Sequence, residues 1–482
     1  MASPAERGLF MAKHDWKIIY SGNSPVEMRA LEFLYGEMGN FMLRDWGTYA
    51  LYTMACERAS GELPDENSVV IGVGSENELL KKFIDPAAIP ADGFILQKRD
   101  NPQYPGKQLV LIAGSNAAAV LYGVVTLVDD VLLSQTPRDN NAVISDTDVF
   151  GVPMKDFTMT DAPASRIRSV FTWAHPIGNM YEYFRNMARL KFNRVYMWNE
   201  FPPVNAAEIV NYAHSWGIET FWGFAWGWST NCPGTDTADL DALRKNILDE
   251  YYDVWAKLPG DGIYFQSFTE MVQREINGRS VADCVIELVN GITGELLKKD
   301  PALKIVFGLH ASSVKDDLEI IARSDARLEI LWEDCGNFPF NCINEVPTPG
   351  KDLAFVRDLF AQNHFMGLVY KCQLTQKWAD FAHQSGAYIL GHNGSKMQTN
   401  DLAVTESSWR NYKAVWSEHG KIAYDLAQVI QSEGGPDVEM NVAAQLNGPI
   451  HWPTALTAEL FWNSNRNYIE IVKCAQRKIF VL

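Results

Sequence analysis

From about residue 161 onward, short apolar segments of strand-like composition alternate with segments of helical periodicity. This alternation constrains the fold more than any other feature. The strand candidates are Ile167–Trp173, Arg194–Trp198, Glu219–Phe224, Gly262–Phe268, Lys304–Leu309, Leu328–Trp332, Phe365–Tyr370 and Ala387–Leu390. Eight such βα units match a (β/α)8 TIM barrel in size. A doubly wound open sheet is the alternative, but it would need fewer strands or a Gly-rich phosphate-binding turn, and we find neither.

The barrel pattern divides the chain into three predicted regions. Residues 1–155 are expected to form a small α/β domain, because buried strands such as Val69–Gly74 are followed by helical segments. Residues 156–400 are the predicted catalytic barrel. Residues 401–482 contain helical patterns and no clear strand, so a short helical C-terminal region is expected.

Charge and composition exclude several functions. The net charge of −17 argues against nucleic acids and anionic membranes as partners, because both need a basic surface. The sequence has no apolar run of membrane-spanning length and no apolar leader near its beginning. Its seven scattered cysteines form no C-x-x-C pair. We therefore expect a cytoplasmic protein with reduced thiols. The glycines Gly72 and Gly74 match only part of a dinucleotide-binding motif, so no cofactor is predicted.

The segment Gly262–Phe268 is followed by a carboxylate, Glu270, at the point where the strand ends. Barrel enzymes present their catalytic groups at the carboxyl-terminal ends of the strands. A glycosidase needs one carboxyl group that protonates the leaving oxygen, and apolar neighbours such as Phe265 and Phe268 favour that protonated form. Glu270 is therefore the predicted general acid.

The other strand ends are rich in polar and aromatic residues. Acids, histidines, amides and tryptophans on one rim are typical of a sugar-binding site. The predicted substrate-binding residues are Trp173, His175, Trp198, Asn199, Glu200, Trp222, His310, Trp332, Tyr370, Lys371, His392 and Asn393. Glu333 or Asp334, after the sixth strand candidate, is the predicted base or nucleophile. A separation of roughly 5–5.5 Å from the acid would indicate retention and roughly 6.5–9.5 Å inversion.

Each assignment has a structural alternative. Glu270 can cap the next helix or pair with Arg274, and Glu333 with Asp334 can be a solvated loop pair. Glu200 can hold its own loop through a salt bridge. The three histidines can bind zinc with an acid, but the usual H-x-H pair after the first strand is missing, so no metal is predicted.

Several short motifs carry a family resemblance. They are Leu109–Gly114 with Val120–Gly123, Asp161–Pro163 with Arg168, Ala188–Asn193, Thr269-Glu270, Cys372–Gln376, and Leu460–Asn463 with Ile469–Ile471. Together they resemble glycoside hydrolase family 67, the microbial α-glucuronidases, and more distantly families 115 and 20. The resemblance implies a small α/β domain, a catalytic barrel and a helical C-terminal part. It also places Glu270 at the position of the family's proton donor.

The chain departs from those families at three positions. Lys371 stands where family 67 has a catalytic glutamate before the match to Gln373. The family's second acid has no counterpart in the loop near Gly336–Phe340. Thr269 replaces the aspartate that steers the acetamide group in family 20. The resemblance thus implies a fold and a reaction class more than a particular substrate.

The leading hypothesis is a glycoside hydrolase that cleaves a small oligosaccharide. A uronic-acid-containing substrate is favoured, because Lys371 supplies a cation in an acidic protein. One alternative is a lyase or aldolase that forms a Schiff base through Lys371. Another is a non-catalytic carbohydrate-binding barrel. Barrels of this group often dimerise, so a homodimer is the expected assembly.

Overall fold

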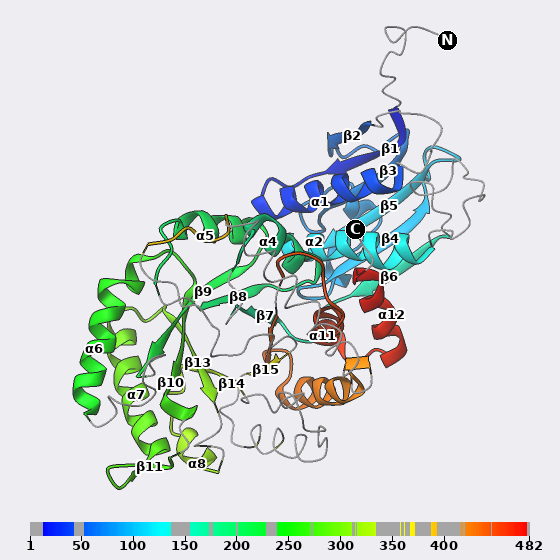
Figure 1. The fold of residues 1–482 in the computed structure, drawn as a ribbon. Coiled ribbons are helices and arrows are strands. Elements are labelled where there is room, and N and C mark those ends of the chain that lie inside the picture. The colour runs from blue at the N-terminus through cyan, green and yellow to red at the C-terminus, as the bar shows by residue number, and fades with distance from the viewer. Residues whose placement is uncertain are drawn as a thin grey trace, which may run out of the picture. The chain divides into compact units, whose positions relative to one another are not determined.

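The structure is a computed structural model of residues 1–482, and Figure 1 shows its helices and strands. The residues that it describes are 13–42, 53–135, 155–172, 177–198, 201–227, 239–270, 273–310, 314, 316–333, 357, 361, 367–371, 387–392, 416–417, 420–444 and 446–479. The chain divides into two compact units. The first comprises Met1–Pro163 with Ser215–Gly217, and the second Ala164–His214 with Ile218–Leu482.

The first unit is built on a mixed sheet with the strand order β2-β1-β3-β5-β4-β6. Its strands are β1 (Lys13–Tyr20), β2 (Thr53–Arg58), β3 (Asn67–Val73), β4 (Phe94–Asp100), β5 (Gln108–Gly114) and β6 (Phe157–Asp161). Its α-helices are α1 (Pro25–Met42), α2 (Ala117–Val125) and α3 (Leu133–Gln135). β3 and β5 are buried along their whole length, as their continuous apolar runs predict.

The second unit is a closed parallel barrel with the strand order β10-β13-β14-β15-β16-β7-β8-β9. The strands are β7 (Ile167–Phe171), β8 (Arg194–Trp198), β9 (Glu219–Trp226), β10 (Gly262–Ser267), β13 (Lys304–His310), β14 (Glu329–Glu333), β15 (Gly367–Lys371) and β16 (Glu439–Ala443). A two-stranded hairpin, β11 (Glu275–Ile276) with β12 (Arg279–Ser280), follows β10. The predicted fold class, a (β/α)8 barrel preceded by an α/β domain, is confirmed.

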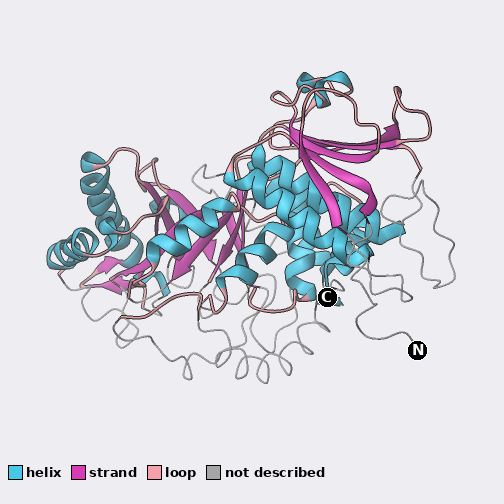
Figure 2. Cartoon of the chain, turned by 90° about the horizontal axis from the view of Figure 1, so that it is seen from above, coloured by secondary structure: helices cyan, strands magenta, loops and turns pink. Residues whose placement is uncertain are grey.

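Helices lie around the barrel strands (Figure 2). They are α4 (Met180–Arg189), α5 (Ala206–Ser215), α6 (Leu240–Asp253), α7 (Val281–Lys299), α8 (Leu318–Ile321), α11 (Trp452–Asn463) and α12 (Tyr468–Ile479). Side-chain caps fix where three of them begin: the Asn179, Asp239 and Ser280 side chains accept backbone N–H bonds at the starts of α4, α6 and α7. No helix in the described part of the chain has both the length and the apolar character needed to cross a bilayer.

The predicted eighth strand was wrong. Residues 387–390 are irregular, and they bond instead to the loop after β8: the Val204 N–H donates to the Tyr388 carbonyl, and the Leu390 N–H donates to the Asn205 side chain. The barrel is closed by β16, within the region predicted to be helical. β16 lacks the continuous apolar pattern of a buried strand because Glu439 and Asn441 face the lumen, where Glu439 accepts from Ser169 and Arg194 and the Asn441 amide donates to Ser169.

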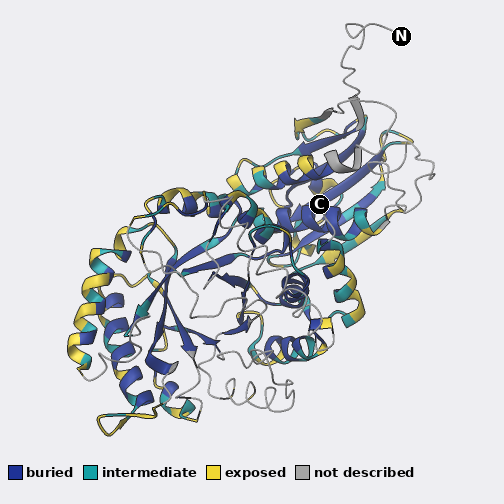
Figure 3. Ribbon diagram, viewed as in Figure 1, coloured by how far each residue is buried: buried dark blue, intermediate teal, exposed yellow. Residues whose placement is uncertain are grey.

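Side chains alternate between the lumen and the surrounding helices along every barrel strand. The barrel strands are largely buried (Figure 3). An apolar cluster of residues packs in the middle of the lumen, so the barrel is a core and not a channel. Its members are Phe171, Tyr196, Phe221, Tyr264, Val306, Leu331, Val369 and Ala443. This layer separates two polar groups of residues at the two ends of the strands.

An ion network closes the amino-terminal end of the lumen. Arg194 begins β8, and its guanidinium bonds Glu219 at 2.9 Å, Glu329 at 2.8 Å and Glu439 at 2.9 Å, each the first residue of its own strand. The Tyr196 hydroxyl donates to Glu439 at 2.8 Å. Burial by itself lowers the pKa of Arg194, but Tyr196 and the carboxylates raise it overall, so the guanidinium stays charged.

Replacement of Arg194 by methionine should destabilise the barrel strongly, because it leaves the buried Glu439 carboxylate without its cation. We expect a loss of roughly 3–5 kcal/mol in the free energy of unfolding, measured by urea denaturation. Lys245→Met, which breaks an exposed pair with Asp249, is the control and should cost under about 0.5 kcal/mol. Equal losses in the two variants would contradict a structural role for the network.

Candidate functional site at the barrel mouth

The carboxyl-terminal end of the lumen holds a second polar group of residues, which we call the mouth cluster. It comprises Trp198, Tyr264, Gln266, Gly308 and Glu333, from β8, β10, β13 and β14. All of these positions belong to the lumen-facing register of their strands, and all except Trp198 are buried. This is the end of a barrel at which catalytic groups gather.

Glu333 is the centre of the mouth cluster. It is the last residue of β14 and is 0% exposed. Its Oε1 accepts a hydrogen bond from the Tyr264 hydroxyl and another from the Gln266 amide, at 2.7 Å. The alternative that Glu333 belongs to a solvated loop is therefore wrong.

The two donors decide which form of Glu333 the cluster favours. An amide N–H can only donate, and an ionised carboxylate can only accept. Hydrogen bonds donated to a carboxylate favour its charged form, and burial opposes that form. The two donors on one oxygen therefore favour the carboxylate form of Glu333.

Gly308 makes the contact between Tyr264 and Glu333 possible. A Cβ at position 308 would overlap the Tyr264 hydroxyl and would come within 2.8 Å of Oε1 of Glu333. β13 lies between β10 and β14 in the barrel, so a side chain at this position would stand between the two partners. The missing side chain lets two non-adjacent strands meet across the lumen.

Trp198 supplies a flat apolar surface beside the carboxylate. It ends β8 and is partly exposed, and its indole contacts the rings of Phe171 and Tyr264 edge-on, at centroid distances of 6.3 and 6.1 Å. Gly223 on β9 leaves room for it, since a Cβ there would approach the indole to 2.8 Å. The structure thus brings the predicted residues Trp198 and Glu333 into one cluster, with Tyr264 contacting both.

Three further predicted residues are placed by their backbone. Glu270 ends the 3₁₀ turn Phe268–Glu270 that directly follows β10. His310 is the last residue of β13 and pairs in register with Glu333, and Lys371 is the last residue of β15. Six other predicted residues lie outside the described part of the chain: Trp173, His175, Asn199, Glu200, Asp334 and Asn393.

Three predicted aromatic residues face away from the lumen. Trp222 is buried against the β9–β10 connection and donates to the Pro259 carbonyl at 2.7 Å. The Tyr370 hydroxyl donates to the Ala423 carbonyl, and Trp332 occupies the outward position between Leu331 and Glu333. The prediction took every residue near a strand end as part of the rim, but alternation sends each second side chain outward.

His392 lies over the helices instead of at a strand end. Its backbone forms an isolated bridge with Asn179, which caps α4, and its ring contacts Glu208 of α5 at 3.0 Å. The side-chain hydrogen bond from Asn205, together with that from His392, lowers the pKa of Glu208.

The side chain of Arg274, which the sequence offers as a partner for Glu270, forms an ion pair with Asp316 at 2.7 Å.

Sequence reasoning missed Tyr264 and Gln266. The stretch Gly262–Ser267 was interpreted as a buried strand, and only the acid beyond it was selected. The available signal was the alternation within the strand, because Tyr264 and Gln266 share one face while Ile263 and Phe265 occupy the other.

Among the described residues, no group of three or more histidine, cysteine or acidic side chains has an arrangement that could hold a metal ion.

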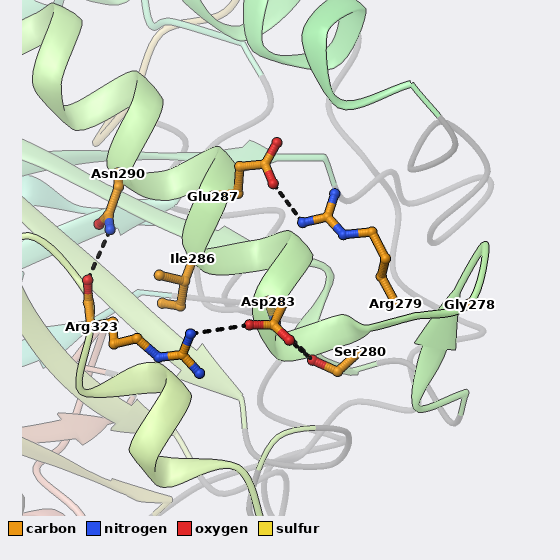
Figure 4. A pocket seen from close by; sticks show the side chains of 8 residues that line it. All are labelled: Gly278, Arg279, Ser280, Asp283, Ile286, Glu287, Asn290 and Arg323. Carbon is orange, nitrogen blue, oxygen red and sulfur yellow. Dashed lines mark hydrogen bonds and ion pairs between the residues drawn. The ribbon is translucent and has the colours of Figure 1, made fainter.

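A separate hollow of about 570 Å³ lies at the N-terminal part of α7 (Figure 4). Its lining residues are Gly278, Arg279, Ser280, Asp283, Ile286, Glu287, Asn290 and Arg323. The charged groups there already have partners: Arg279 bonds Glu287 at 2.5 Å, and Arg323 lies 3.4 Å from Asp283. These ion pairs are on exposed side chains, which is typical of a solvated surface.

Comparison with known proteins gives weak likenesses. No family model matches the chain, and no curated protein matches it in sequence. Among solved structures, a GH20 β-N-acetylhexosaminidase from Streptomyces coelicolor A3(2) is 13% identical, with 80% of this chain and 78% of that one covered and a TM-score of 0.43. A GH20 exo-β-N-acetylglucosaminidase from Vibrio harveyi is 10% identical, with 96% and 73% covered and a TM-score of 0.45.

A mutant β-hexosaminidase from Streptomyces plicatus is likewise 13% identical, with 79% and 76% covered and a TM-score of 0.43. The barrel assignment rests on the strand pairing of this chain itself. The resemblance to family 67 stays a prediction.

The outward placement of Trp222 predicts a loss of stability on replacement. Trp222→Phe removes a buried hydrogen bond to the Pro259 carbonyl, so we expect the free energy of unfolding to fall by roughly 1–3 kcal/mol in urea denaturation. Trp198→Phe, at a partly exposed position, is the matched control and should cost less. A larger loss at Trp198 than at Trp222 would speak against this placement.

Proposed function

We propose that the protein is a glycoside hydrolase whose active site is the barrel mouth. A single observation carries the proposal: a fully buried carboxylate, Glu333, receives two side-chain donors at the carboxyl-terminal end of a barrel, beside the partly exposed indole of Trp198. A carboxylate held in its charged form next to a flat apolar surface meets two requirements of sugar cleavage.

Glu333 is proposed as the base or nucleophile. As a base it takes a proton from the water that attacks the anomeric carbon. As a nucleophile it bonds that carbon itself, and water later releases the sugar and restores the carboxylate. Both routes require an ionised group, which is the form that donors from Tyr264 and Gln266 favour.

Glu270 is proposed as the general acid that gives its proton to the leaving oxygen. Two features support this role. Its backbone directly follows β10, the strand that carries both donors to Glu333. Its neighbour Phe268 is fully buried, and an apolar surround favours a protonated acid. β10 and β14 are separated in the barrel by β13 alone, so both strands end on the same side of the mouth.

The proposed substrate is a small oligosaccharide, with a uronic acid favoured. Trp198 is the stacking surface for a sugar ring, since a tryptophan offers a large rigid apolar face at small conformational cost. Lys371 ends β15, which pairs with the strand that carries Glu333. A lysine ammonium there would suit the carboxylate of a uronic acid.

The two carboxyl groups should differ in their dependence on the leaving group. For Glu333→Gln we expect kcat to fall by roughly 10²–10⁴-fold on all substrates. For Glu270→Gln we expect a similar loss with sugar leaving groups but a smaller one with nitrophenyl glycosides, whose leaving oxygen needs little protonation. The measurement is kcat on a panel of nitrophenyl glycosides, including the glucuronide, and on matching oligosaccharides.

Glu287→Gln, on the outer surface of α7, is the control and should keep wild-type kinetics. Full activity in Glu333→Gln would overturn the proposal. Trapping of substrate on Lys371 by borohydride would instead identify a Schiff-base lyase.

A further inference from the structure

We propose that Tyr264 is the positioning residue of the barrel mouth, fixing Glu333 through its hydroxyl and the Trp198 indole through its ring. This inference rests on the proposed glycosidase function. It assigns to Tyr264 the task of holding the carboxylate and the indole in place, which is separate from proton transfer and from contact with the sugar. It concerns how the stacking surface and the reacting carboxylate keep one relative geometry.

The hydroxyl end of Tyr264 contacts the carboxylate. It donates to Oε1 of Glu333, and Gln266, two residues further along the same strand, approaches both groups: its amide lies 3.3 Å from the Tyr264 oxygen and 2.7 Å from Oε1. Gly308 is the position at which any side chain would separate them. The carboxylate oxygen therefore has a defined place set by β10.

The ring of Tyr264 contacts the stacking surface. Its centroid lies 6.1 Å from that of Trp198 in an edge-on contact, and 5.0 Å from that of Phe171. A Cβ on Gly223 would come within 2.8 Å of the Trp198 indole and 3.4 Å of the Tyr264 ring. The indole therefore packs against the rings of Phe171 and Tyr264 and over the backbone of Gly223.

Tyr264 is itself held rigidly, which is what a positioning role requires. It is 1% exposed and packs in the apolar middle layer of the lumen against Tyr196, at a centroid distance of 4.9 Å. A sugar stacked on Trp198 would then lie at a fixed height relative to Glu333. Reacting atoms need such alignment, since a misplacement of about 1 Å can cost about 100-fold in rate.

The barrel also contains a matched control. Tyr196 is a second buried lumen tyrosine whose hydroxyl donates to a buried glutamate, but that glutamate is Glu439, in the network at the opposite end of the strands. Tyr196→Phe and Tyr264→Phe therefore remove the same chemical group from the same layer. Tyr196→Phe should lower stability but not activity, because Tyr196 contacts neither Glu333 nor Trp198 in the described part of the chain.

The test is a comparison of steady-state kinetics in four variants of the full-length protein, with folding of each checked by circular dichroism. Tyr264→Phe should lower kcat by about 10- to 100-fold with little change in KM, because one bond to a charged group is lost. Gly223→Ala should raise KM by about 3- to 10-fold with kcat nearly unchanged, because it displaces the Trp198 indole. Tyr196→Phe should leave both constants unchanged, and Glu333→Gln sets the level of inactivity.

The outcomes separate this inference from the proposed function. If Glu333→Gln is inactive but Tyr264→Phe keeps the wild-type kcat, the positioning role is overturned and the glycosidase proposal survives. If Glu333→Gln is fully active, the proposed function itself fails. If Tyr264→Phe does not fold, Gly308→Ala takes its place, because a Cβ at position 308 would overlap the Tyr264 hydroxyl and break its contact with Glu333. A wild-type kcat in that variant overturns the positioning role equally.

Discussion

The candidate site depends on the hydrogen bond from the Tyr264 hydroxyl to the Glu333 carboxylate inside the barrel lumen. A carboxyl group with no exposed surface would ordinarily be protonated or would move to the protein surface, because burial penalises its charged form. Here a phenol and an amide meet one of its oxygens, and a glycine on the intervening strand clears the path between them. The contact joins two strands that are not neighbours, so it needs β13 in place between them.

At both ends of the lumen, a buried glutamate accepts a hydrogen bond from a tyrosine hydroxyl, but the consequences differ. At the amino-terminal end, the carboxylate of Glu439 has Tyr196 and also Arg194 as partners, and the charge is neutralised within the fold. At the mouth, Oε1 of Glu333 accepts hydrogen bonds from the Tyr264 hydroxyl and the Gln266 amide, and the partly exposed Trp198 contacts the Tyr264 ring. The first arrangement stabilises the barrel, and we propose that the second presents a carboxylate to a substrate. The apolar layer between them keeps the structural and the chemical end apart.

The sequence predicts the architecture better than the site. Seven of the eight strand candidates were placed correctly, because a strand buried on both faces leaves a clear apolar pattern. β16 was missed because Glu439 and Asn441 are polar residues whose hydrogen-bond partners, Arg194 and Ser169, lie far away in the sequence. Glu333 and Trp198 were identified by their places at strand ends. Trp222 was assigned to the wrong face, and Tyr264 was passed over. Alternation shows which residues of a strand share a face, but which face lines the lumen, and which side chain each residue meets there, emerge only from the strand register.

The ionisation of Glu333 is the property on which this account rests, and it can be measured without a substrate. The experiment is an infrared difference spectrum at neutral pH between wild-type protein and Glu333→Gln, each labelled with carbon-13 in the glutamate side-chain carboxyl groups. The account predicts that the residue missing from the variant contributes a carboxylate band, and that this band shifts when Tyr264 is replaced by phenylalanine. A protonated-carboxyl band in its place would contradict the account.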